Sequence, residues 1–447
     1  MDARRSATRL GVVACTAFAA LAARAAWMAL APAPAPAPVE HACIDMHASR
    51  GRILDRHGAP LAIEDENGVR RYALGPTRVI GGLEHGVGTS GIEATYERAL
   101  AGEPGRLCVP RTGRRELPRV LREPMAGEDV VTTLAAELQR AIERTFTLRA
   151  DREAAAVVLD ARSGAVRALV SHAGPDAPLD RDVDLAIGRA MPMGSAGKLA
   201  SAAAALELGI DPHPPVRCNG SWAFAEGYGR CTGEHGEVDL EEAIASGDYA
   251  FFYAHAAEVG APRLADVQAR LGFGSASGID LPGEASGSLV PREGLSALEL
   301  AVAFGGHEDA VRATPLQAAV AYATLLEGRL VRPFVVGPPR EARATDVIAP
   351  AHRALLLSAL SRTVRGADGR LRERLDARQV HGATVGHSFV GELDGDEPLV
   401  RANWMVALVP AEEPRFVVVV LSSRRAGETE LGQEVIDATV STLGGDP

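Results

Sequence analysis

The N-terminal part of the chain carries an apolar segment, residues 10–31, that is long enough to cross a bilayer once. Three arginines precede it: Arg4, Arg5 and Arg9. Positive charges on one flank of an apolar run are typical of an export signal. We expect an uncleaved membrane anchor over residues 1–31, because Pro32 would hinder cleavage and Arg24 could extend its charge to the interface. A cleavable signal with a small-residue processing site at residues 29–31 is the alternative.

The segment after the anchor lacks helical or strand periodicity. Residues 31–38 alternate alanine and proline, which predicts a stiff polyproline-type spacer of roughly 25 Å, and we expect a linker over residues 32–48. From residue 49 to residue 123 glycine recurs at short intervals, a pattern that indicates a small, loop-rich domain. This predicted domain, residues 49–123, is called the pedestal below.

Residues 124–447 show both helical and strand patterns, and the first helix and the first two strands are distinct along the chain. Helical spacing over residues 134–147 is followed by two β-prone runs, residues 154–159 and 165–171. The polar, glycine-containing loop between these runs suits a hairpin. The hairpin is the first indication of a sheet in this domain.

The remainder of the domain is mostly helical until its last strands. Helical patterns dominate residues 195–326, and one of them begins with Thr314 at the N-cap, followed by proline at the first helical position. Residues 401–409 and 416–422 are expected strands, and residues 429–443 a closing helix. Strands at both ends with helices between them predict an α+β fold, in which one antiparallel sheet is packed by helices and a helical subdomain is attached.

Composition and charge narrow the class of protein. A chain of 447 residues with 47% hydrophobic and 23% charged content can form a sizeable core and two or three domains. The net charge of -11 leaves no broad basic surface to neutralise phosphates, so no nucleic acid partner is expected. The chain contains one lysine, Lys198. Because arginine cannot give up its proton near neutral pH, a lone lysine is a candidate for base chemistry, and chance loss of the other lysines is the alternative.

Four cysteines lie outside the predicted anchor, an even number that suits an oxidising compartment: Cys43, Cys108, Cys218 and Cys231. A disulfide between Cys218 and Cys231 is the better-supported pair, because the two bracket a short glycine-rich loop. A disulfide between Cys43 and Cys108 follows only by elimination. Neither spacing resembles a zinc site, and we expect no metal.

Ser195 and Lys198 open a helical pattern that continues to residue 208. Positions i and i+3 share one face of a helix, so the hydroxyl and the amine can come within hydrogen-bonding reach. A serine at a helix N-terminus, with a desolvated neutral lysine as its base, is an activated nucleophile. The S-x-x-K pattern alone is weak, but here it contains the only lysine of the chain, which favours catalysis over an N-cap serine beside a surface lysine.

With this motif the chain resembles the class B, or monofunctional, penicillin-binding proteins, which are membrane-anchored cell-wall transpeptidases. In the pedestal, RGRILDRHGAPLA at residues 50–62 and GTSGIE at residues 88–93 are similar to the family's signatures. Landmarks of the transpeptidase domain follow in the family's order at residues 156–160, 271–274, 278–284 and 312–317. The resemblance therefore covers nearly the whole chain beyond the anchor, and it implies a transpeptidase domain over residues 124–447.

The resemblance also implies a reaction. Ser195 would attack the D-Ala-D-Ala carbonyl of a stem peptide and pass the acyl group to an amine on a neighbouring strand, with Lys198 as the base in acylation. β-Lactams would acylate the same serine. Backbone N–H groups of Ser195 and of the third-motif strand would hold the oxyanion, as backbone groups can whatever their side chains.

The second motif departs from the family pattern. Where the family has Ser-x-Asn, this chain has Ser246 and Asp248 on either side of a glycine, followed by aromatic residues from Tyr249 onward. Ser246 is expected to relay a proton. A carboxylate at Asp248 would favour the ammonium form of Lys198 and oppose its action as a base, and an ordinary acid at a helix start is the alternative interpretation.

The third motif departs further, because the segment HGATVGHSF, where Lys-Thr-Gly should fall, has no lysine. If Gly386 is the motif glycine, Thr384 stands at the lysine position. His387 and Ser388 then remain to meet a substrate carboxylate. If Gly382 is instead the glycine that precedes the motif, Thr384 keeps the threonine position. In both alignments the fixed cation that helps to keep the neighbouring lysine neutral is missing. A protonated His387 would supply part of that charge, but a solvated histidine at the strand end is the favoured interpretation.

Two functions compete for this sequence. The first is a penicillin-binding peptidoglycan D,D-transpeptidase, supported by Ser195, Lys198 and Ser246. The second is a catalytically impaired scaffold that regulates a cell-wall polymerase or division complex, supported by the lost Lys-Thr-Gly. Drift explains the lost third motif readily but explains a preserved serine and lysine poorly, so we place the transpeptidase first. A β-lactam sensor or hydrolase would need a deacylation base, which the sequence does not offer.

The resemblance implies partners and a location as well. We expect peptidoglycan stem peptides and β-lactams as ligands and a membrane glycan polymerase of the SEDS type as a protein partner. The chain should cross the inner or plasma membrane once and carry its catalytic domain on the extracytoplasmic side. No nucleotide or flavin motif is present in the sequence, and we expect no cofactor.

Overall fold

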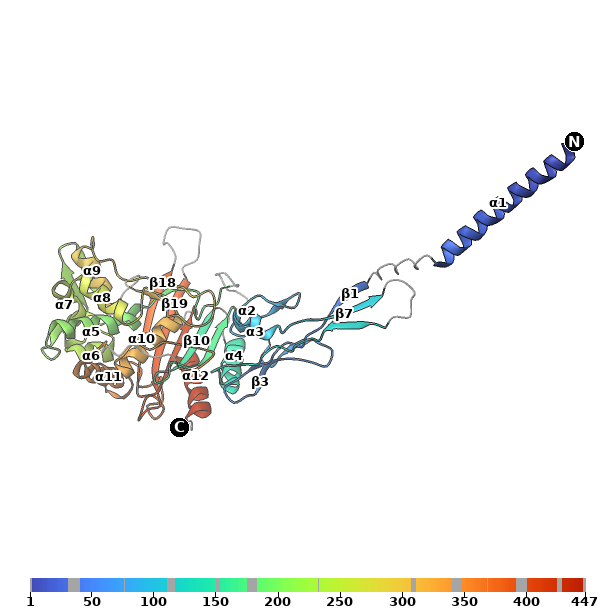
Figure 1. The fold of residues 1–447 in the computed structure, drawn as a ribbon. Helices are drawn as coiled ribbons and strands as arrows, with labels where there is room; N and C mark the ends of the chain where they lie inside the picture. Colours follow the sequence, from blue (N-terminus) through green and yellow to red (C-terminus); the bar gives the residue numbers. More distant parts are fainter. Residues whose placement is uncertain are drawn as a thin grey trace. The chain divides into compact units, whose positions relative to one another are not determined.

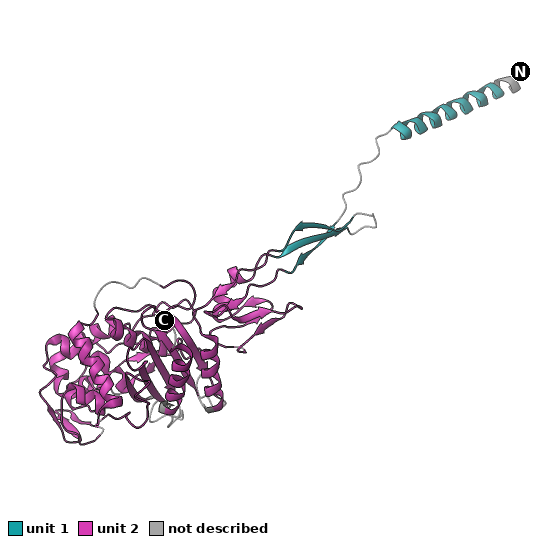
Figure 2. Ribbon diagram, turned by 90° about the horizontal axis from the view of Figure 1, so that it is seen from below, with its two compact units in different colours: residues 1–47, 104–124 teal, residues 48–103, 125–447 magenta. Residues whose placement is uncertain are grey.

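The structure is a computed structural model of the chain (Figure 1). It describes residues 2–30, 41–75, 77–110, 117–149, 153–174, 183–231, 233–306, 311–339, 347–367, 369–390, 400–423 and 428–444. Contacts divide the chain into two compact units (Figure 2): Met1–His47 with Pro104–Pro124, and Ala48–Glu103 with Met125–Pro447. The predicted boundaries of linker, pedestal and transpeptidase domain remain predictions.

The first unit contains the predicted anchor and a small sheet. Within helix α1 (Asp2–Leu30), the segment Ser6–Leu30 is long and apolar enough to cross a membrane, with a mean hydropathy of 1.6. The sheet is antiparallel, in the order β1-β7-β8: β1 (His41–Met46), β7 (Gly105–Pro110) and β8 (Arg119–Arg122). Cys43 lies opposite Cys108 in the β1–β7 register, and the two form a disulfide. The predicted spacer, residues 31–38, lies outside the described residues.

The second unit begins with short strands and helices, which lie within the predicted pedestal except for β9. A four-stranded sheet has the order β4-β3-β2-β9, with β2 and β9 parallel: β2 (Ile53–Leu54), β3 (Pro60–Glu64), β4 (Arg70–Tyr72) and β9 (Val130–Val131). A hairpin and two short helices follow β4 in the chain: β5 (Leu83–Glu84), β6 (Val87–Gly88), α2 (Gly91–Thr95) and α3 (Glu97–Leu100).

Buried charges join the two pedestal motifs of the sequence. Arg50 Nε donates to Glu93 Oε2 at 2.8 Å, and Arg70 Nε donates to Glu93 Oε1 at 2.7 Å. All three side chains are almost fully buried. Arg50 also reaches Glu97 through its NH2 group at 2.5 Å. A buried carboxylate that binds two guanidinium groups links Arg50 of the first pedestal motif to Glu93 of the second.

A five-stranded antiparallel sheet forms the centre of the second unit, in the order β11-β10-β20-β19-β18 (Figure 1). Its strands are β10 (Ala154–Asp160), β11 (Val166–His172), β18 (Gly382–Val390), β19 (Val400–Val409) and β20 (Phe416–Ser422). The predicted hairpin is confirmed as β10 and β11, and the two predicted C-terminal strands as β19 and β20.

Side chains alternate along β10 and sort the core into two layers. Ala155, Val157 and Leu159 join the core layer that contains helices α5 (Lys198–Leu208) and α10 (Pro315–Glu327). The intervening residues join the layer of α4 (Ala136–Arg149) and α12 (Glu428–Leu443). A sheet whose side chains alternate between two helix-covered layers confirms the predicted α+β fold.

The helical subdomain lies between β11 and β18 in the chain. Besides α5 and α10 it contains α6 (Leu240–Ser246), α7 (Ala250–Val259), α8 (Ala261–Arg270), α9 (Ala297–Phe304) and α11 (Pro350–Arg365). Small strand pairs lie between these helices: β12 (Met191–Pro192) with β17 (Arg312–Ala313), β13 (Val216–Cys218) with β16 (Gly236–Val238), and β14 (Ser221–Phe224) with β15 (Gly227–Arg230). Thr314 caps α10 as predicted, with its side chain accepting from the Gln317 N–H.

The predicted disulfide between Cys218 and Cys231 is wrong, because both residues are free thiols. Strand β13 pairs with β16, which places Cys218 opposite Gly236, and the Cys218 thiol donates to the carbonyl of Gly233 at 3.3 Å. Burial and the neighbouring Cys218 raise the pKa of the Cys231 thiol to about 12. The bond inferred by elimination, between Cys43 and Cys108, is the disulfide that forms.

Candidate active site

Ser195 lies on a 3₁₀ turn, η1 (Gly194–Gly197), which leads directly into α5. The turn begins at Gly194, whose φ of 56° favours glycine. A Cβ at Gly194 would also lie 2.5 Å from the His387 carbonyl oxygen, so a strand of the central sheet runs close behind the turn. The Ser195 hydroxyl is 3.3 Å from the hydroxyl of Tyr249.

Lys198 is the first residue of α5, and its amine is buried, with 5% of the residue exposed. The amine donates to the carbonyls of Gly247 at 3.1 Å and Asp248 at 2.7 Å. It also lies 3.8 Å from the centroid of the Tyr249 ring. Burial, and next the positive charge of Arg370, lower the pKa of Lys198 well below its ordinary value.

The two carbonyl contacts can serve a neutral amine, whereas the Tyr249 ring favours the charged ammonium form. A neutral amine has two N–H donors and one lone pair, and both donors can be satisfied by the carbonyls of Gly247 and Asp248. The lone pair then remains to accept a proton. Ser195 and Lys198 line one small cavity of about 20 Å³, so the structure brings the predicted nucleophile and base together.

The second motif forms the turn between α6 and α7. Ser246 ends α6, and its hydroxyl donates to the Glu242 carbonyl of its own helix at 2.7 Å. Gly247 follows with a φ of 80°, which carries the chain to the buried Asp248. Ser246 thus lies beside the residues that hold the Lys198 amine, while its hydroxyl bonds within the helix, and its relay role remains a prediction.

Asp248 acts on Lys198 in two opposite ways. Its carbonyl holds the amine, whereas its carboxylate raises the pKa of Lys198, which is the direction expected from the sequence. Burial and Arg370 have larger effects than the carboxylate, so the net pKa of Lys198 is low. The carboxylate is itself engaged, because it accepts from the Ala250 N–H at 2.5 Å and contacts His235.

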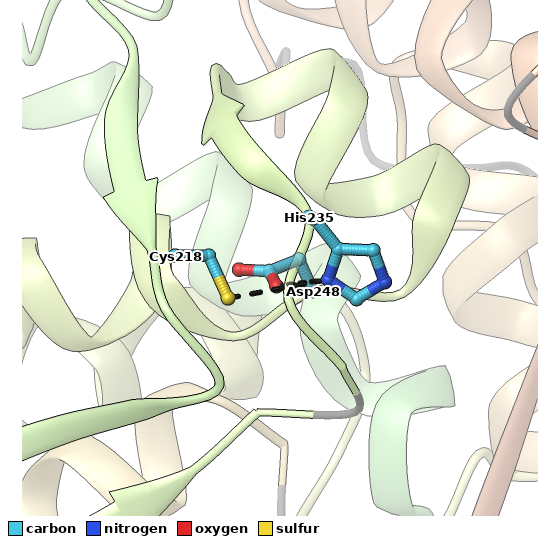
Figure 3. A group of neighbouring side chains, drawn as sticks. All are labelled: Cys218, His235 and Asp248. Atoms are coloured by element: carbon cyan, nitrogen blue, oxygen red, sulfur yellow. Dashed lines mark hydrogen bonds and ion pairs between the residues drawn. The ribbon is translucent and has the colours of Figure 1, made fainter.

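Cys218, His235 and Asp248 form a compact polar cluster behind this turn (Figure 3). His235 Nδ1 lies 2.6 Å from Asp248 Oδ2 and 4.0 Å from Cys218 Sγ. Thiol, imidazole and carboxylate are the donor types that zinc prefers, but here the imidazole and the carboxylate bond to each other. The sequence-based expectation that the chain needs no metal remains a prediction.

Strand β18 carries the third motif past the nucleophile. A Cβ at Gly386 would lie 2.1 Å from the carbonyl oxygen of Met193 and 2.7 Å from the backbone nitrogen of Ala196, so only glycine fits. This close approach favours the alignment in which Gly386 is the motif glycine. Thr384, two residues earlier on the same face, then stands at the lysine position and lines the cavity of Ser195.

The other predicted substrate contacts lie farther along β18. His387 is exposed, and its Nδ1 lies 3.0 Å from Asn403 Oδ1. Ser388 is buried, and its hydroxyl donates to the Pro192 carbonyl at 2.7 Å. Trp404, which pairs with Gly386, donates to the same carbonyl. Ser388 therefore fixes the segment before the nucleophile, and the substrate contacts of both residues remain predictions.

Arg370 is the residue of this site that the sequence analysis missed. It lies between α11 and β18, and its guanidinium lines the cavity of Ser195 and Lys198. Its NH2 group donates to the Val385 carbonyl at 2.5 Å and approaches Thr384 Oγ1 at 3.4 Å. No motif marks it, because it is one of many arginines in the chain. In the sequence, Tyr249 stands out only as the first of the aromatic residues after the second motif, but in the structure its hydroxyl contacts Ser195 and its ring contacts Lys198.

Comparisons with known proteins agree with this geometry. A model of the family described as the penicillin binding protein transpeptidase domain matches residues 154–440, more than half of the chain. The peptidoglycan D,D-transpeptidase MrdA of Escherichia coli strain K12 is 32% identical over 234 residues, which cover 47% of this chain and 36% of that protein. The alignment therefore spans only about a third of the relative's length.

Solved structures share the fold at lower identity. Penicillin binding protein 3 of Mycobacterium tuberculosis, complexed with ampicillin, has a TM-score of 0.74 and 21% identity, covering 90% of this chain and 97% of that chain. A complex between the penicillin-binding protein PBP2 and MreC of Helicobacter pylori has a TM-score of 0.75 and 16% identity, covering 90% and 99%. These likenesses extend the shared fold beyond the matched domain to the predicted pedestal.

Proposed function

The chain belongs to the penicillin-binding protein transpeptidase family, and we propose that it is a peptidoglycan D,D-transpeptidase that forms an acyl-enzyme on Ser195. One observation carries the proposal: the only lysine of the chain is buried in the same cavity as the serine three residues before it. Its amine has two carbonyl acceptors and a strongly lowered pKa. A neutral lysine beside a serine at a helix start is an activated nucleophile.

In acylation, the Ser195 oxygen attacks the carbonyl carbon of the penultimate D-Ala, and its proton passes to the Lys198 amine. The negative charge that develops on the carbonyl oxygen is held by backbone N–H groups of Ser195 and of β18, which Gly386 allows to approach. The bond to the terminal D-Ala then breaks. The departing amine takes up a proton, and an ester on Ser195 remains.

In the second half-reaction, an amine of a neighbouring stem peptide attacks the ester carbonyl. The amine loses a proton to the site, the new amide forms, and the Ser195 oxygen regains its proton as it leaves. Two peptides are then cross-linked and the serine is free. The Tyr249 hydroxyl, 3.3 Å from the Ser195 oxygen, can orient that oxygen in both half-reactions.

β-Lactams are proposed to react at the same serine, because their strained amide presents a carbonyl to the nucleophile. The structural neighbour from Mycobacterium tuberculosis is described as complexed with ampicillin, which supports this ligand class. No cofactor enters the proposed reaction, because the nucleophile, the base and the backbone donors all belong to the chain.

Location and protein partners are part of the proposal. Helix α1 supports a single membrane crossing, and the disulfide between Cys43 and Cys108 supports an extracytoplasmic position for the domains that follow. The neighbour from Helicobacter pylori is described as a complex with MreC, which supports a protein partner in the cell-wall machinery. A membrane glycan polymerase of the SEDS type is proposed as a further partner.

A scaffold without catalysis is the second candidate, and a specific observation favours it: Thr384, which our alignment places at the third-motif lysine position, lines the cavity where a cation would be expected. The experiment that separates the two candidates is intact-protein mass spectrometry of the full chain in detergent micelles after incubation with a penicillin. A transpeptidase gains the whole mass of the drug, because ring opening releases no atom.

Two variants complete the experiment. Ser195→Ala should remove the adduct, whereas Ser201→Ala, on the same helix, should retain it. Absence of an adduct on the wild-type chain at high drug concentration would support the scaffold.

A further inference from the structure

Arg370 lines the cavity of Ser195 and Lys198, although no sequence motif contains it. Its backbone N–H donates to the Ala245 carbonyl of α6 at 3.2 Å, and its NH2 group donates to the Val385 carbonyl of β18 at 2.5 Å. The same NH2 group is 3.4 Å from the hydroxyl of Thr384. Arg370 therefore connects the second-motif side of the site to the third-motif strand, where Thr384 stands in the lysine position.

The guanidinium also packs against the residue that holds the Lys198 amine. Gly247 has a φ of 80°, which favours glycine, and a Cβ there would lie 2.4 Å from the NH1 atom at the end of the Arg370 side chain. The carbonyl of Gly247 accepts from the Lys198 amine at 3.1 Å. One glycine thus separates the arginine cation from the amine, and a charge at this distance in a buried site acts strongly.

Within the part of the chain that the structure describes, no carboxylate forms an ion pair with Arg370. Its Nε is buried without a hydrogen-bond partner. A half-buried guanidinium whose buried Nε lacks a hydrogen-bond partner is unfavourable for folding. Such a group is typical of functional sites, where an uncompensated charge acts on a neighbouring reactive group.

We propose that Arg370 supplies the permanent positive charge that keeps the Lys198 amine neutral, in place of the lysine that is missing from β18. This inference rests on the proposed function, because it concerns the base of the same reaction. Arginine keeps its proton at neutral pH even when buried, so its charge is fixed. A fixed cation disfavours a second cation beside it. Arg370 is therefore a positioning residue, which acts through Lys198.

The other groups around Lys198 act in both directions. Burial lowers its pKa most, Arg370 lowers it next, and Asp248 and Cys231 raise it. The hydroxyl of Tyr322 on α10 lies in the same cavity, and burial raises the pKa of that hydroxyl, so it stays neutral. Tyr249 contributes the ring beneath the amine. Among the described residues, Arg370 is thus the positively charged side chain that lowers the pKa of Lys198.

The lone lysine makes a direct test available. The full-length chain is labelled with ¹³Cε-lysine, carries a lysine-free tag and is held in detergent micelles. Because Lys198 is the only lysine, its NMR spectrum has a single lysine resonance. Its titration midpoint should lie well below the ordinary 10.5 in the wild type. In Arg370→Gln the midpoint should rise by about one to two pH units, the size expected for a nearby charge in a partly buried site. An unchanged midpoint in a folded Arg370→Gln protein would overturn the proposal.

The matched control is Arg372→Gln, an exposed arginine two residues away. It should leave the lysine midpoint unchanged. An equal rise in Arg372→Gln would mean that the net charge of the segment, rather than Arg370, sets the protonation of Lys198, and would also overturn the proposal.

Acylation by a fluorescent penicillin provides the second readout. In Arg370→Gln the pH of half-maximal acylation should rise with the lysine midpoint, so that the rate near neutral pH falls about tenfold per pH unit and recovers at higher pH. A merely structural defect would lower the rate by one factor at every pH. Arg370→Lys should retain most of the wild-type profile because it keeps the charge.

A rescue variant keeps the test decisive if Arg370→Gln is poorly folded. Adding Thr384→Lys to Arg370→Gln places a cation at the strand position that Arg370 now reaches, and it should restore acylation near neutral pH. Failure of both Arg370→Lys and this double variant, in folded protein, would contradict the proposal. If the wild-type chain takes up no penicillin at any pH, the proposed function fails, while the lysine resonance still tests Arg370.

Discussion

The hydroxyl oxygens of Ser195 and Tyr249 lie 3.3 Å apart, although 54 residues separate them in the chain. Tyr249 also places its ring 3.8 Å from the Lys198 amine. One aromatic side chain therefore contacts both members of the proposed nucleophile and base. Tyr249 belongs to the turn that follows the second motif. Its contacts with Ser195 and Lys198 therefore hold that turn against the start of α5.

Tyr249→Phe should slow acylation by a fluorescent penicillin about 3- to 10-fold, which corresponds to the loss of one hydrogen bond of about 1 kcal/mol. The ring remains beneath the amine, so the pH of half-maximal acylation should not move. The measurement is the second-order rate constant as a function of pH. Tyr253→Phe is the control, because its hydroxyl bonds to the Arg230 carbonyl instead. Equal rates for both variants would exclude a role for the Tyr249 hydroxyl.

Asp248→Asn should shift the acylation profile to lower pH. The carboxylate raises the pKa of Lys198, so its removal lowers that pKa and leaves more of the amine neutral under acidic conditions. This direction is opposite to the shift expected for Arg370→Gln. Glu237→Gln, an exposed acid on the nearby β16, should not move the profile. A shift to higher pH would show that the carboxylate does not act on the lysine through its charge.

Glu93→Gln should lower the free energy of unfolding by about 3–5 kcal/mol, because it leaves the guanidinium groups of Arg50 and Arg70 buried without their shared carboxylate. The measurement is urea unfolding of the full chain in detergent. Asp129→Asn is the matched control, since its pair with Arg52 is largely exposed and should contribute little. Similar losses of unfolding free energy in Glu93→Gln and Asp129→Asn would contradict the claim that burial makes the Glu93 ion pairs important.

Glu143→Gln should stabilise the protein at high pH and leave it unchanged at low pH. Burial raises the pKa of Glu143 from the ordinary 4.5 to about 7. The stability that Glu143 contributes is fully present at pH values below its pKa in the unfolded state. This stability is lost as the pH rises through the folded-state pKa of about 7.

The measurement for this variant is the thermal midpoint at pH 5 and pH 8. At pH 8 the wild type carries a buried carboxylate that glutamine lacks. Glu137→Gln, on the exposed face of the same helix, should show no such difference between the two pH values. An identical response to pH in Glu143→Gln and the wild type would count against the buried carboxylate.

Local patterns predicted most of the second unit. The hairpin of β10 and β11, helix α4 and the Thr314 cap each depend on residues within one element or one turn. Their physical causes are periodic burial and backbone capping, which are readable in a short window. The nucleophile and base were readable for the same reason, since Ser195 and Lys198 are three residues apart.

The disulfide shows where local reasoning failed. Closeness along the chain favoured Cys218 with Cys231, but both remain thiols, and Cys218 lies opposite Gly236 in the pairing of β13 with β16. Cys43 and Cys108 are 65 residues apart, and only the pairing of β1 with β7 places them opposite each other. Register between distant strands is a property of the folded sheet, which sequence spacing does not express.

The sequence by itself determined the α+β architecture, the serine and lysine of the site, and the absence of a lysine from the third motif, because these depend on residue types and short-range periodicity. Tertiary structure alone decided which groups surround the Lys198 amine. Asp248, Tyr249 and Arg370 reach it from segments that are 50 to more than 150 residues away in the chain. The protonation of a buried amine depends on charges in space, and their positions are fixed only when the helices and β18 pack together.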